Sequence, residues 1–265
     1  MTLHMQNSKN FYETKCRQIS RTKRHEKLIS ENIRLGKNVK IRENAIIRDN
    51  VVIGDDVTIF PNVYIGENTH IGEGSTIQYG AFIEHDCNIG KHTRIGTNAV
   101  LRRETNIGDN SIFGSLSASE GKNWIGNNVL IHSQCHLTSG LIIEDWVFVA
   151  PEFVGANDPD MLHGRRHLKK FVPKAPRIKF GTGIAVNVTV LPGVVIGREC
   201  IIGAHSIVTK DVPDFSIAYG VPAKVAKTVD EKWKLPEELY QEFRRRVTEE
   251  DLAKFLDKVL SDYRQ

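Results

Sequence analysis

The 265-residue sequence lacks the features that mark several large classes of protein. No apolar run approaches the roughly eighteen residues of a membrane span, and the polar N-terminus has no apolar signal core. The net charge of +4 is mild, and no interleaved basic and aromatic pattern indicates nucleic-acid binding. These absences predict a soluble cytoplasmic protein with neither a membrane span nor a nucleic-acid partner.

Cysteine is also scarce, with four residues in the chain. Three of them, Cys87, Cys135 and Cys200, fall at the small inward position of the repeat described next. This placement favours buried thiols over disulfides or metal ligands. We therefore expect no metal site.

What the sequence does contain is one long repeat of six residues. From Leu35 to Val149 an apolar residue recurs at every sixth position, and of these twenty anchors only Ser119 is polar. Neither a helix, with its period of about 3.6, nor an alternating strand, with its period of 2, produces this pattern. A six-residue period is typical of parallel β-helix solenoids, so we predict a triangular coil with three six-residue sides.

Two weaker regularities accompany the anchors. A small or β-branched residue stands four positions after each anchor, as at Val51 and Ala81, and glycine often follows an anchor directly, as at Gly54 and Gly66. We interpret the glycines as residues that accept the φ values required at corners. Coils of eighteen residues should then stack at about 4.8 Å.

The repeat divides the chain into three expected parts. Residues 1–34 form an N-terminal arm or cap, residues 35–228 form the β-helix, and residues 229–265 form helices. The period stops after Val149 and resumes at Ile178, 29 residues later, which is not a multiple of six. The sequence therefore predicts an external loop over about residues 155–177, and a long loop in a compact repeat is usually functional.

Several passages near the C-terminal end of the repeat resemble a known family. Residues 190–197, 202–213 and 219–225 resemble the C-terminal signature of hexapeptide-repeat acyltransferases. Residues 143–159 are most similar to acetyl-CoA-dependent nucleotide-sugar N-acetyltransferases. The resemblance implies a left-handed parallel β-helix and a homotrimer, with active sites in clefts between neighbouring coils. It also implies that acetyl-CoA lies along the C-terminal coils.

The resemblance and the repeat together indicate residues for the acetyl-CoA site. Lys210 and Lys224 match places where the family contacts CoA, while Ala185 and Ala204 stand at corners where a small side chain lets the thioester and pantetheine approach the backbone. The predicted loop adds four cations that are suited to phosphates of CoA or of a nucleotide sugar, namely Arg165, Arg166, Lys169 and Lys170.

Acetyl transfer needs a group that receives a proton, and histidine suits this role. His85 stands in a His-Asp-Cys passage that resembles another branch of sugar acetyltransferases, in which this histidine is the general base. Coil counting, however, puts His85 about 26 Å below the C-terminal coil. His136 and His132 belong to the hexad one coil below the point where the loop leaves, and we expect His136 to face outward. We therefore rank His136 first, with His85 and His132 less favoured.

Asn157 and Asp158 complete the candidate catalytic set. Asp158 stands where related acyltransferases carry a loop histidine, so it is a candidate to orient or deprotonate an amine, and Asn157 is a candidate to hold the sugar or the intermediate. Relatives with a Gln-Asn-Asn and a Tyr-Glu-Gly differ from this chain, which has residues 132–134 and 138–140 in their places. The glutamate of that pattern is missing, which leaves both the acceptor and the base open.

Three functions follow. The first is N-acetylation of an amino sugar that is nucleotide-linked, and the second is O-acetylation of a saccharide or small hydroxylated acceptor. The third is use of the coil as a γ-class carbonic anhydrase-like enzyme or a scaffold. His132 and His136 are four residues apart on a strand and do not converge, so they make a poor metal site.

Overall fold

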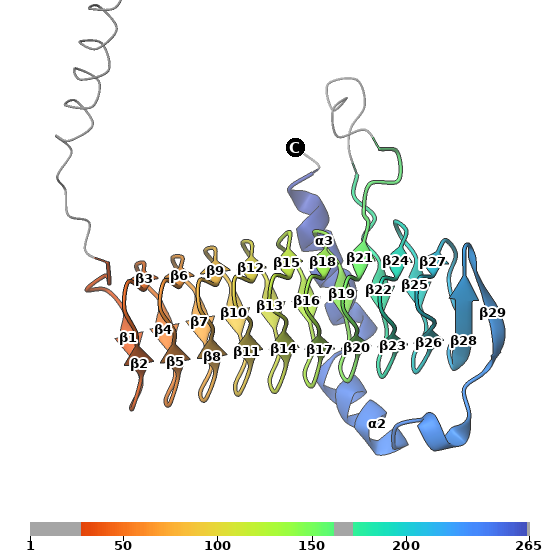
Figure 1. The fold of residues 1–265 in the computed structure, drawn as a ribbon, viewed down its shortest axis with the longest axis horizontal. Helices are drawn as coiled ribbons and strands as arrows, with labels where there is room; N and C mark the ends of the chain where they lie inside the picture. The colour runs from red at the N-terminus through yellow and green to blue at the C-terminus, as the bar shows by residue number, and fades with distance from the viewer. Residues whose placement is uncertain (1–27, 162–171, 264–265) are drawn as a thin grey trace, which may run out of the picture.

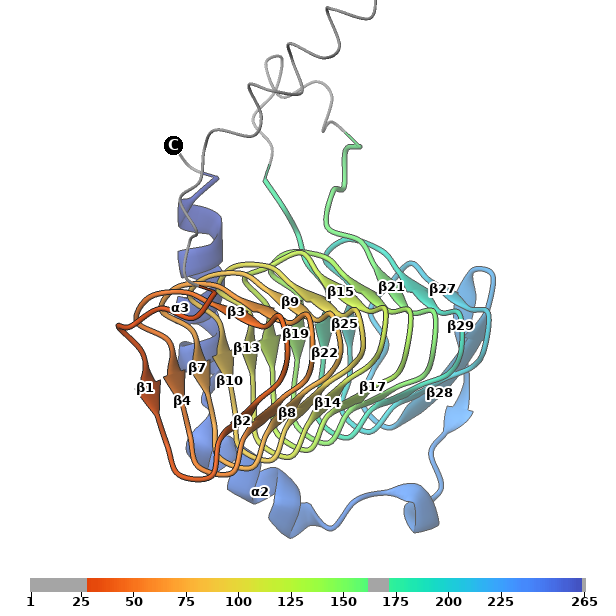
Figure 2. The same ribbon diagram turned by 60° about the vertical axis from the view of Figure 1, so that its left-hand side comes forward.

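The computed structural model describes residues 28–161 and 172–263. The chain winds into a prism with three faces, each a sheet built from one short strand per coil (Figures 1 and 2). The predicted fold class, a left-handed parallel β-helix with a protruding loop and a C-terminal helical extension, is confirmed.

Strands from successive coils lie side by side in each face. Face 1 contains nine strands, β1 (Arg34–Leu35), β4 (Val52–Ile53), β7 (His70–Ile71), β10 (Asn88–Ile89), β13 (Asn106–Ile107), β16 (Trp124–Ile125), β19 (Ile142–Ile143), β22 (Arg177–Ile178) and β25 (Val195–Ile196). Face 2 contains eleven, β2 (Lys40–Ile41), β5 (Thr58–Ile59), β8 (Thr76–Ile77), β11 (Arg94–Ile95), β14 (Ile112–Phe113), β17 (Leu130–Ile131), β20 (Phe148–Val149), β23 (Gly183–Ile184), β26 (Ile201–Ile202), β28 (Ser216–Gly220) and β29 (Ala223–Thr228). Face 3 contains nine, β3 (Ile46–Ile47), β6 (Tyr64–Ile65), β9 (Phe82–Ile83), β12 (Val100–Leu101), β15 (Ala118–Ser119), β18 (His136–Leu137), β21 (Val154–Gly155), β24 (Thr189–Val190) and β27 (Ile207–Val208).

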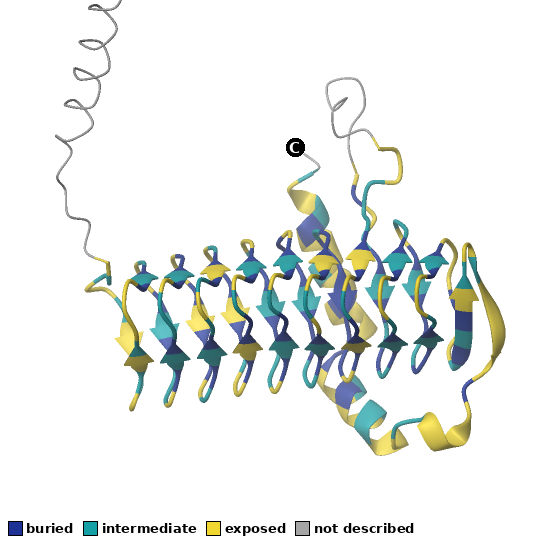
Figure 3. Cartoon of the chain, viewed as in Figure 1, coloured by how far each residue is buried: buried dark blue, intermediate teal, exposed yellow. Residues whose placement is uncertain are grey.

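The second residue of each two-residue strand points into the prism and the first points out. From Ile47 to Val208 these inward residues are nearly all buried, and they form one continuous core (Figure 3). Leu35 is 50 % exposed because it belongs to the terminal coil. The predicted burial of Cys87, Cys135 and Cys200 is confirmed, and desolvation raises the pKa of Cys87 to about 12. The thiols are therefore packing groups rather than nucleophiles.

The polar anchor Ser119 is fully buried and satisfied by hydrogen bonds. Its hydroxyl lies 2.7 Å from that of Thr105 and donates to the side-chain oxygen of Asn123 at 2.5 Å. The amide of Asn123 in turn donates to the carbonyl of Thr138 in the coil above at 2.8 Å. At Ser119, where the apolar pattern is interrupted, a hydrogen-bonded network therefore offsets the free-energy cost of burying a hydroxyl.

The interpretation of the glycines that follow anchors was wrong. Positive φ values occur three residues after the anchors, most often at asparagine, as at Asn50 with φ of 59° and Asn68 with φ of 56°. Glycines such as Gly66 serve close packing instead, since a Cβ there would lie 2.6 Å from the backbone nitrogen of His85 in the next coil. Asparagine tolerates the left-handed region better than most residues, which explains its recurrence at corners.

The C-terminal segment turns back along the prism after β29 and covers part of face 1 (Figure 1). It contains the 3-10 helix η2 (Glu231–Trp233), α2 (Glu237–Arg246) and α3 (Glu249–Ser261). Phe180 packs on Phe243 of α2 with ring centroids 5.7 Å apart, and Trp124 of β16 packs edge-on against Phe255 of α3 at 5.7 Å. Thr248 begins α3 with a full capping box. Faces 2 and 3 therefore remain without helical cover in the part of the chain that the structure describes.

An ion cluster around the buried carboxylate of Glu144 joins these helices to the coil. Arg177 of β22 donates to Glu144 from Nε at 2.8 Å and to Glu249 of α3 from Nη1 at 2.6 Å. Glu144 also accepts the backbone N–H of Phe180 at 2.9 Å. Burial raises the pKa of Glu144, and the charge of Arg177 opposes that rise.

Candidate functional site

The loop leaves the prism from face 3, directly above His136. His136 of β18 is the register partner of Val154 in β21, and the described loop residues begin just beyond Gly155. His136 is the outward residue of its strand and is exposed, as expected. The histidine thus faces solvent one coil below the loop.

Asn157 holds the base of the loop against the coil below. Its side-chain amide donates to the carbonyl of Ser139, three residues beyond His136, at 3.0 Å. Its own carbonyl accepts the backbone N–H of Lys174, on the returning arm, at 2.8 Å. Asp158 accepts the backbone N–H of Asp160 at 3.1 Å, so it helps to shape the same turn. Asn157 therefore has a structural task at this corner, besides any contact with a substrate.

The four residues expected to contact acetyl-CoA lie in the last coils of the prism, at two different corners. Ala185 and Ala204 occupy successive coils at the corner between faces 2 and 3. The backbone N–H of Ala185 donates to the carbonyl oxygen of Ile202 at 3.0 Å. Lys210 follows β27, at the corner between faces 3 and 1, and is exposed. Lys224 lies on β29, opposite Tyr219. Tyr219 stacks above Gly203, next to Ala204, so Lys224 lies at the same corner as the alanines, whereas Lys210 lies at another corner.

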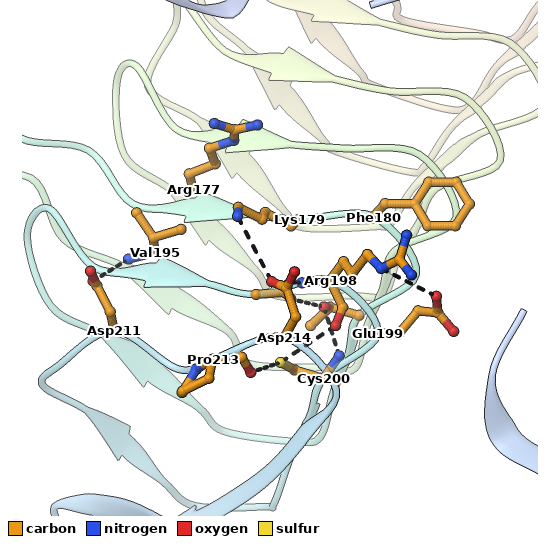
Figure 4. Close-up of polar contacts among 12 residues, drawn as sticks. Arg177, Lys179, Phe180, Val195, Arg198, Glu199, Cys200, Asp211, Pro213 and Asp214 are labelled. Atoms are coloured by element: carbon orange, nitrogen blue, oxygen red, sulfur yellow. Dashed lines mark hydrogen bonds and ion pairs between the residues drawn. The ribbon is translucent and has the colours of Figure 1, made fainter. Parts of the chain in front are cut away.

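Two aspartates fix the turn that follows Lys210. Asp211 accepts the backbone N–H of Val195 at 2.8 Å, and Asp214 accepts that of Arg198 at 2.9 Å (Figure 4). Lys179 lies 3.8 Å from the carboxylate of Asp214. These contacts close the last coil and hold the backbone around Lys210 in place.

His132 faces a different surface from His136. It lines a groove of about 360 Å³ on face 2, together with Leu130 and Arg94. Its Nδ1 accepts the backbone N–H of Ser133 at 3.0 Å. His132 and His136 therefore line different faces of the prism.

His85 has a carboxylate partner. Its Nδ1 lies 2.6 Å from Oδ2 of Asp86, and this hydrogen bond is the main cause that holds the pKa of Asp86 below its ordinary value. Asp86 also ends a ladder of corner side chains, in which Asn50 donates to Asn68 at 3.1 Å and Asn68 to Asp86 at 3.1 Å. A carboxylate that orients one ring nitrogen leaves the other available as a base. His85 nevertheless lies four coils, about 19 Å, below Asn157 on the same corner.

Sequence reasoning missed the cleft beside His85. It has a volume of about 560 Å³, and its walls include Tyr64, Phe82, Arg102 and Arg103. The signal was present in the sequence, because Tyr64 and Phe82 stand eighteen residues apart at outward positions of face 3.

Some expectations fall outside the described residues. These are the N-terminal arm up to residue 27 and the loop cations Arg165, Arg166, Lys169 and Lys170. Among residues 28–161 and 172–263, no three histidine, cysteine, aspartate or glutamate side chains gather in a way that would hold a metal ion. Within the same ranges no helix is both long and apolar enough to cross a membrane.

Comparisons with known proteins agree with this geometry. Residues 50–85 match the family model described as bacterial transferase hexapeptide (six repeats), and residues 184–210 match the hexapeptide repeat of succinyl-transferase. The chain carries the hexapeptide repeat of bacterial transferases. The resemblance to hexapeptide-repeat acyltransferases is thereby confirmed.

The fold of this hexapeptide-repeat chain matches that of a solved structure over most of its length. The structure of LpxA, a UDP-N-acetylglucosamine acyltransferase from Bacteroides fragilis, aligns with a TM-score of 0.59 and 18 % identity, covering 88 % of this chain and 89 % of that one. At this identity the likeness concerns the fold alone.

Closer sequence relatives match a shorter part of the hexapeptide-repeat chain. A protein of Staphylococcus aureus strain MRSA252, provisionally named an acetyltransferase, is 39 % identical over 112 residues, which are 40 % of this chain and 55 % of that protein. The dTDP-3-amino-3,6-dideoxy-alpha-D-galactopyranose 3-N-acetyltransferase of Aneurinibacillus thermoaerophilus is 42 % identical over 48 residues, 18 % of this chain and 25 % of that enzyme. The chain thus aligns with about half, or less, of the length of these curated relatives.

Proposed function

We propose that this protein is an acetyl-CoA-dependent acyltransferase that N-acetylates an amino sugar, and that this sugar is nucleotide-linked. The observation that carries the proposal is the register of His136 with Val154. It places an exposed imidazole one coil below the loop, on the face whose upper edges carry Ala185, Ala204 and Lys210. The name of the Aneurinibacillus relative, an amino-sugar N-acetyltransferase, supports the choice of acceptor.

The chemistry assigned to this site is a single acyl transfer. The acceptor amine attacks the thioester carbonyl of acetyl-CoA, so a C–N bond forms, the C–S bond breaks and the thiolate of CoA leaves. His136 receives the proton that the amine loses, and that proton can then return to the leaving sulfur. Asn157 and Asp158 line the approach from the loop, where an amide and a carboxylate suit the hydroxyls and amine of a sugar.

Acetyl-CoA would lie along the upper coils. The small side chains of Ala185 and Ala204 leave the corner between faces 2 and 3 open to a narrow pantetheine chain. Lys210 and Lys224, both exposed, would meet phosphates near the last coil.

A homotrimer is part of the proposal. Helices cover part of face 1, whereas faces 2 and 3 have no helical cover among the described residues. Both carry exposed apolar side chains, Phe148 on face 2 and Phe82 and Val154 on face 3. A contact between unlike faces of identical chains closes into a ring when the rotation permits it. In such a ring face 2 of one copy would wall the site on face 3 of the next.

One observation favours O-acetylation as a second candidate. A hydroxyl acceptor needs a positioned base more than a neutral amine does, and the pair of His85 and Asp86 is such a base with its orienting carboxylate. In that case the hydroxyl would be activated in the cleft beside His85 rather than at His136.

A thiol-release assay tests the function. Purified protein is mixed with acetyl-CoA and, in separate reactions, with nucleotide-linked amino sugars, free amino sugars and sugars that have only hydroxyl groups. We expect thiol release with the nucleotide-linked amino sugars. Release only with the hydroxylated sugars would transfer the assignment to O-acetylation, and a stoichiometric bound zinc with no thiol release would overturn the acyltransferase proposal.

A further inference from the structure

Face 2 carries a groove that begins below the coils of the proposed acetyl-CoA site. Its main part, of about 360 Å³, extends from Arg94 of β11 up to His132. A smaller part, of about 200 Å³, continues from Arg94 toward Gln78 on the coil below. Gly96 and Gly114 lie on the corner side of the groove and have no side chains to fill it. The groove therefore extends along the prism over several coils.

Arg94 gives this groove a positive charge. It is the exposed outward residue of β11, between Thr76 and Ile112 on the adjacent strands. Among the described residues that line the groove, none carries a carboxylate. Within residues 28–161 and 172–263, the guanidinium of Arg94 has no hydrogen-bond or ion-pair partner. It is therefore available to an anion from outside the chain.

His132 adds a hydrogen-bond donor at the upper end of the groove. Its Nδ1 accepts the backbone N–H of Ser133 at 3.0 Å, so the proton of the neutral ring lies on Nε2. The hydroxyl groups of Ser115 and Ser133 also line the groove. Donors and a positive charge without a competing carboxylate suit an anion, and the planar guanidinium suits the oxygens of a phosphate.

The strand side of the groove is apolar. Ile112 of β14 and Leu130 of β17 are register partners at outward positions, and both are half-buried. Inorganic phosphate would gain nothing from this wall, whereas a ligand with a ring system beside its phosphates would bury apolar surface there. The size of the groove is also in the range of small-molecule sites. These features together favour a nucleoside diphosphate group.

We propose that the groove on face 2 binds the diphosphate of the nucleotide-linked acceptor, beside His136 of the neighbouring copy. This inference rests on the proposed function and on its homotrimer. In a ring whose axis runs along the prism, rotation places face 2 of one copy against face 3 of the next without a shift along the axis. His132 and His136 belong to the same coil, so they then lie at the same height on two copies.

The height of Arg94 fits this arrangement. Arg94 lies two coils below His132, which is about 10 Å along the prism. A sugar whose amine reaches His136 carries its diphosphate on the far side of the pyranose ring, and so one to two coils lower. Acetyl-CoA then approaches the histidine from the upper coils and the nucleotide from the lower ones.

The first test measures binding to the full chain by calorimetry, without acetyl-CoA. The probes are UDP, dTDP and the nucleosides uridine and thymidine. We expect each nucleotide to bind at least about tenfold more tightly than its nucleoside, and Arg94→Gln to weaken UDP about tenfold because a charged hydrogen bond is lost. The matched control is Arg34→Gln, an exposed arginine at the same strand position of face 1, which should leave UDP binding unchanged.

A second pair of variants tests the donor on His132. His132→Gln retains an N–H donor and should weaken UDP less than His132→Leu, which removes it. CoA also carries a diphosphate, so its binding is measured in parallel. We expect Arg94→Gln to leave the affinity for CoA unchanged. An equal loss for UDP and CoA would mean that the groove holds the donor, and it would overturn the assignment to the acceptor.

The contribution of two copies is tested by mixing subunits. Arg94→Gln and His136→Ala chains are co-expressed in equal amounts, and thiol release is measured with a nucleotide-linked amino sugar below its KM. If each site uses Arg94 of one copy and His136 of the next, about a quarter of the sites combine two intact residues, and the rate should recover to about a quarter of wild type. If both residues served one site within a copy, no site would be restored.

The outcomes separate this inference from the acyltransferase function. Equal affinity of the wild-type protein for UDP and uridine, or wild-type affinity of Arg94→Gln for UDP, would overturn the inference. Thiol release with nucleotide-linked amino sugars would in that case leave the acyltransferase function standing. Binding of UDP through Arg94 without any thiol release would support a diphosphate site and contradict the proposed function.

Discussion

His136 lies directly below Val154, as its register partner on the adjacent coil of face 3. The pairing matters because Val154 belongs to the last strand before the loop, whose first corner residue, Asn157, is bonded to Ser139 on the coil of His136. The histidine and the base of the loop are therefore parts of one rigid surface.

Lys210 provides a test of where acetyl-CoA binds. Lys210→Ala should raise the KM for acetyl-CoA by about threefold to tenfold and leave kcat unchanged, since it removes an exposed charge that would meet a phosphate. Steady-state kinetics at saturating acceptor measure both constants. The matched control is Lys40→Ala on the far end of face 2. An unchanged KM in Lys210→Ala would mean that the phosphates of CoA lie elsewhere.

The ion cluster on face 1 predicts a large effect on stability. Glu144, whose side chain is 3 % exposed, accepts bonds from Arg177 and from the backbone of Phe180. Glu144→Ala leaves the partly buried guanidinium without this partner, so we expect the free energy of unfolding to fall by about 3–5 kcal/mol. Denaturant unfolding measures the change.

The control for this prediction is the exposed partner of the same arginine. Glu249 is 60 % exposed in its side chain, so Glu249→Ala should cost about 1 kcal/mol or less. If both variants lost the same free energy of unfolding, the burial of Glu144 would not explain the strength of its contact with Arg177.

The pair of His85 and Asp86 predicts a pH dependence. The hydrogen bond from His85 lowers the pKa of Asp86 from 3.8, so this contact adds stability above pH 3.8 that is lost as the pH falls through the lowered pKa. In His85→Gln the pKa of Asp86 should therefore rise, as measured by NMR titration of its carboxyl carbon. Asn68→Ala, which removes a smaller cause of the shift, should raise this pKa less. An unchanged pKa in His85→Gln would contradict the pairing.

The coil was predictable from the sequence because every anchor follows the same six-residue pattern. An apolar residue at every sixth position fixes which side chains face inward, and stacking then follows at a spacing of eighteen residues. Ser119 breaks the pattern, and the sequence alone does not reveal that Thr105 and Asn123 satisfy its hydroxyl. The packing of the helices on face 1 was not predicted, although Trp124 and Ile142 mark it as apolar residues at outward positions.

The candidate site was predictable only as far as coil counting reaches. Adding eighteen to His136 gives Val154, so their pairing follows from the period. Counting does not show which side chains have partners, and so it missed the carboxylate that orients the ring of His85. It also missed the cleft over Gly66, since a cleft depends on how side chains from four coils fill space.

The central claim is that acetyl transfer takes place at His136, and the most direct measurement compares kcat for three histidine variants. The assay follows thiol release from acetyl-CoA with a nucleotide-linked amino sugar at saturation. We predict that His136→Ala lowers kcat by about a hundredfold, the loss expected for a general base. His70→Ala, an exposed outward histidine on face 1, should retain the wild-type kcat. If His136→Ala kept the wild-type kcat and His85→Ala lost it, transfer would take place beside Asp86, and the account given for His136 would be wrong.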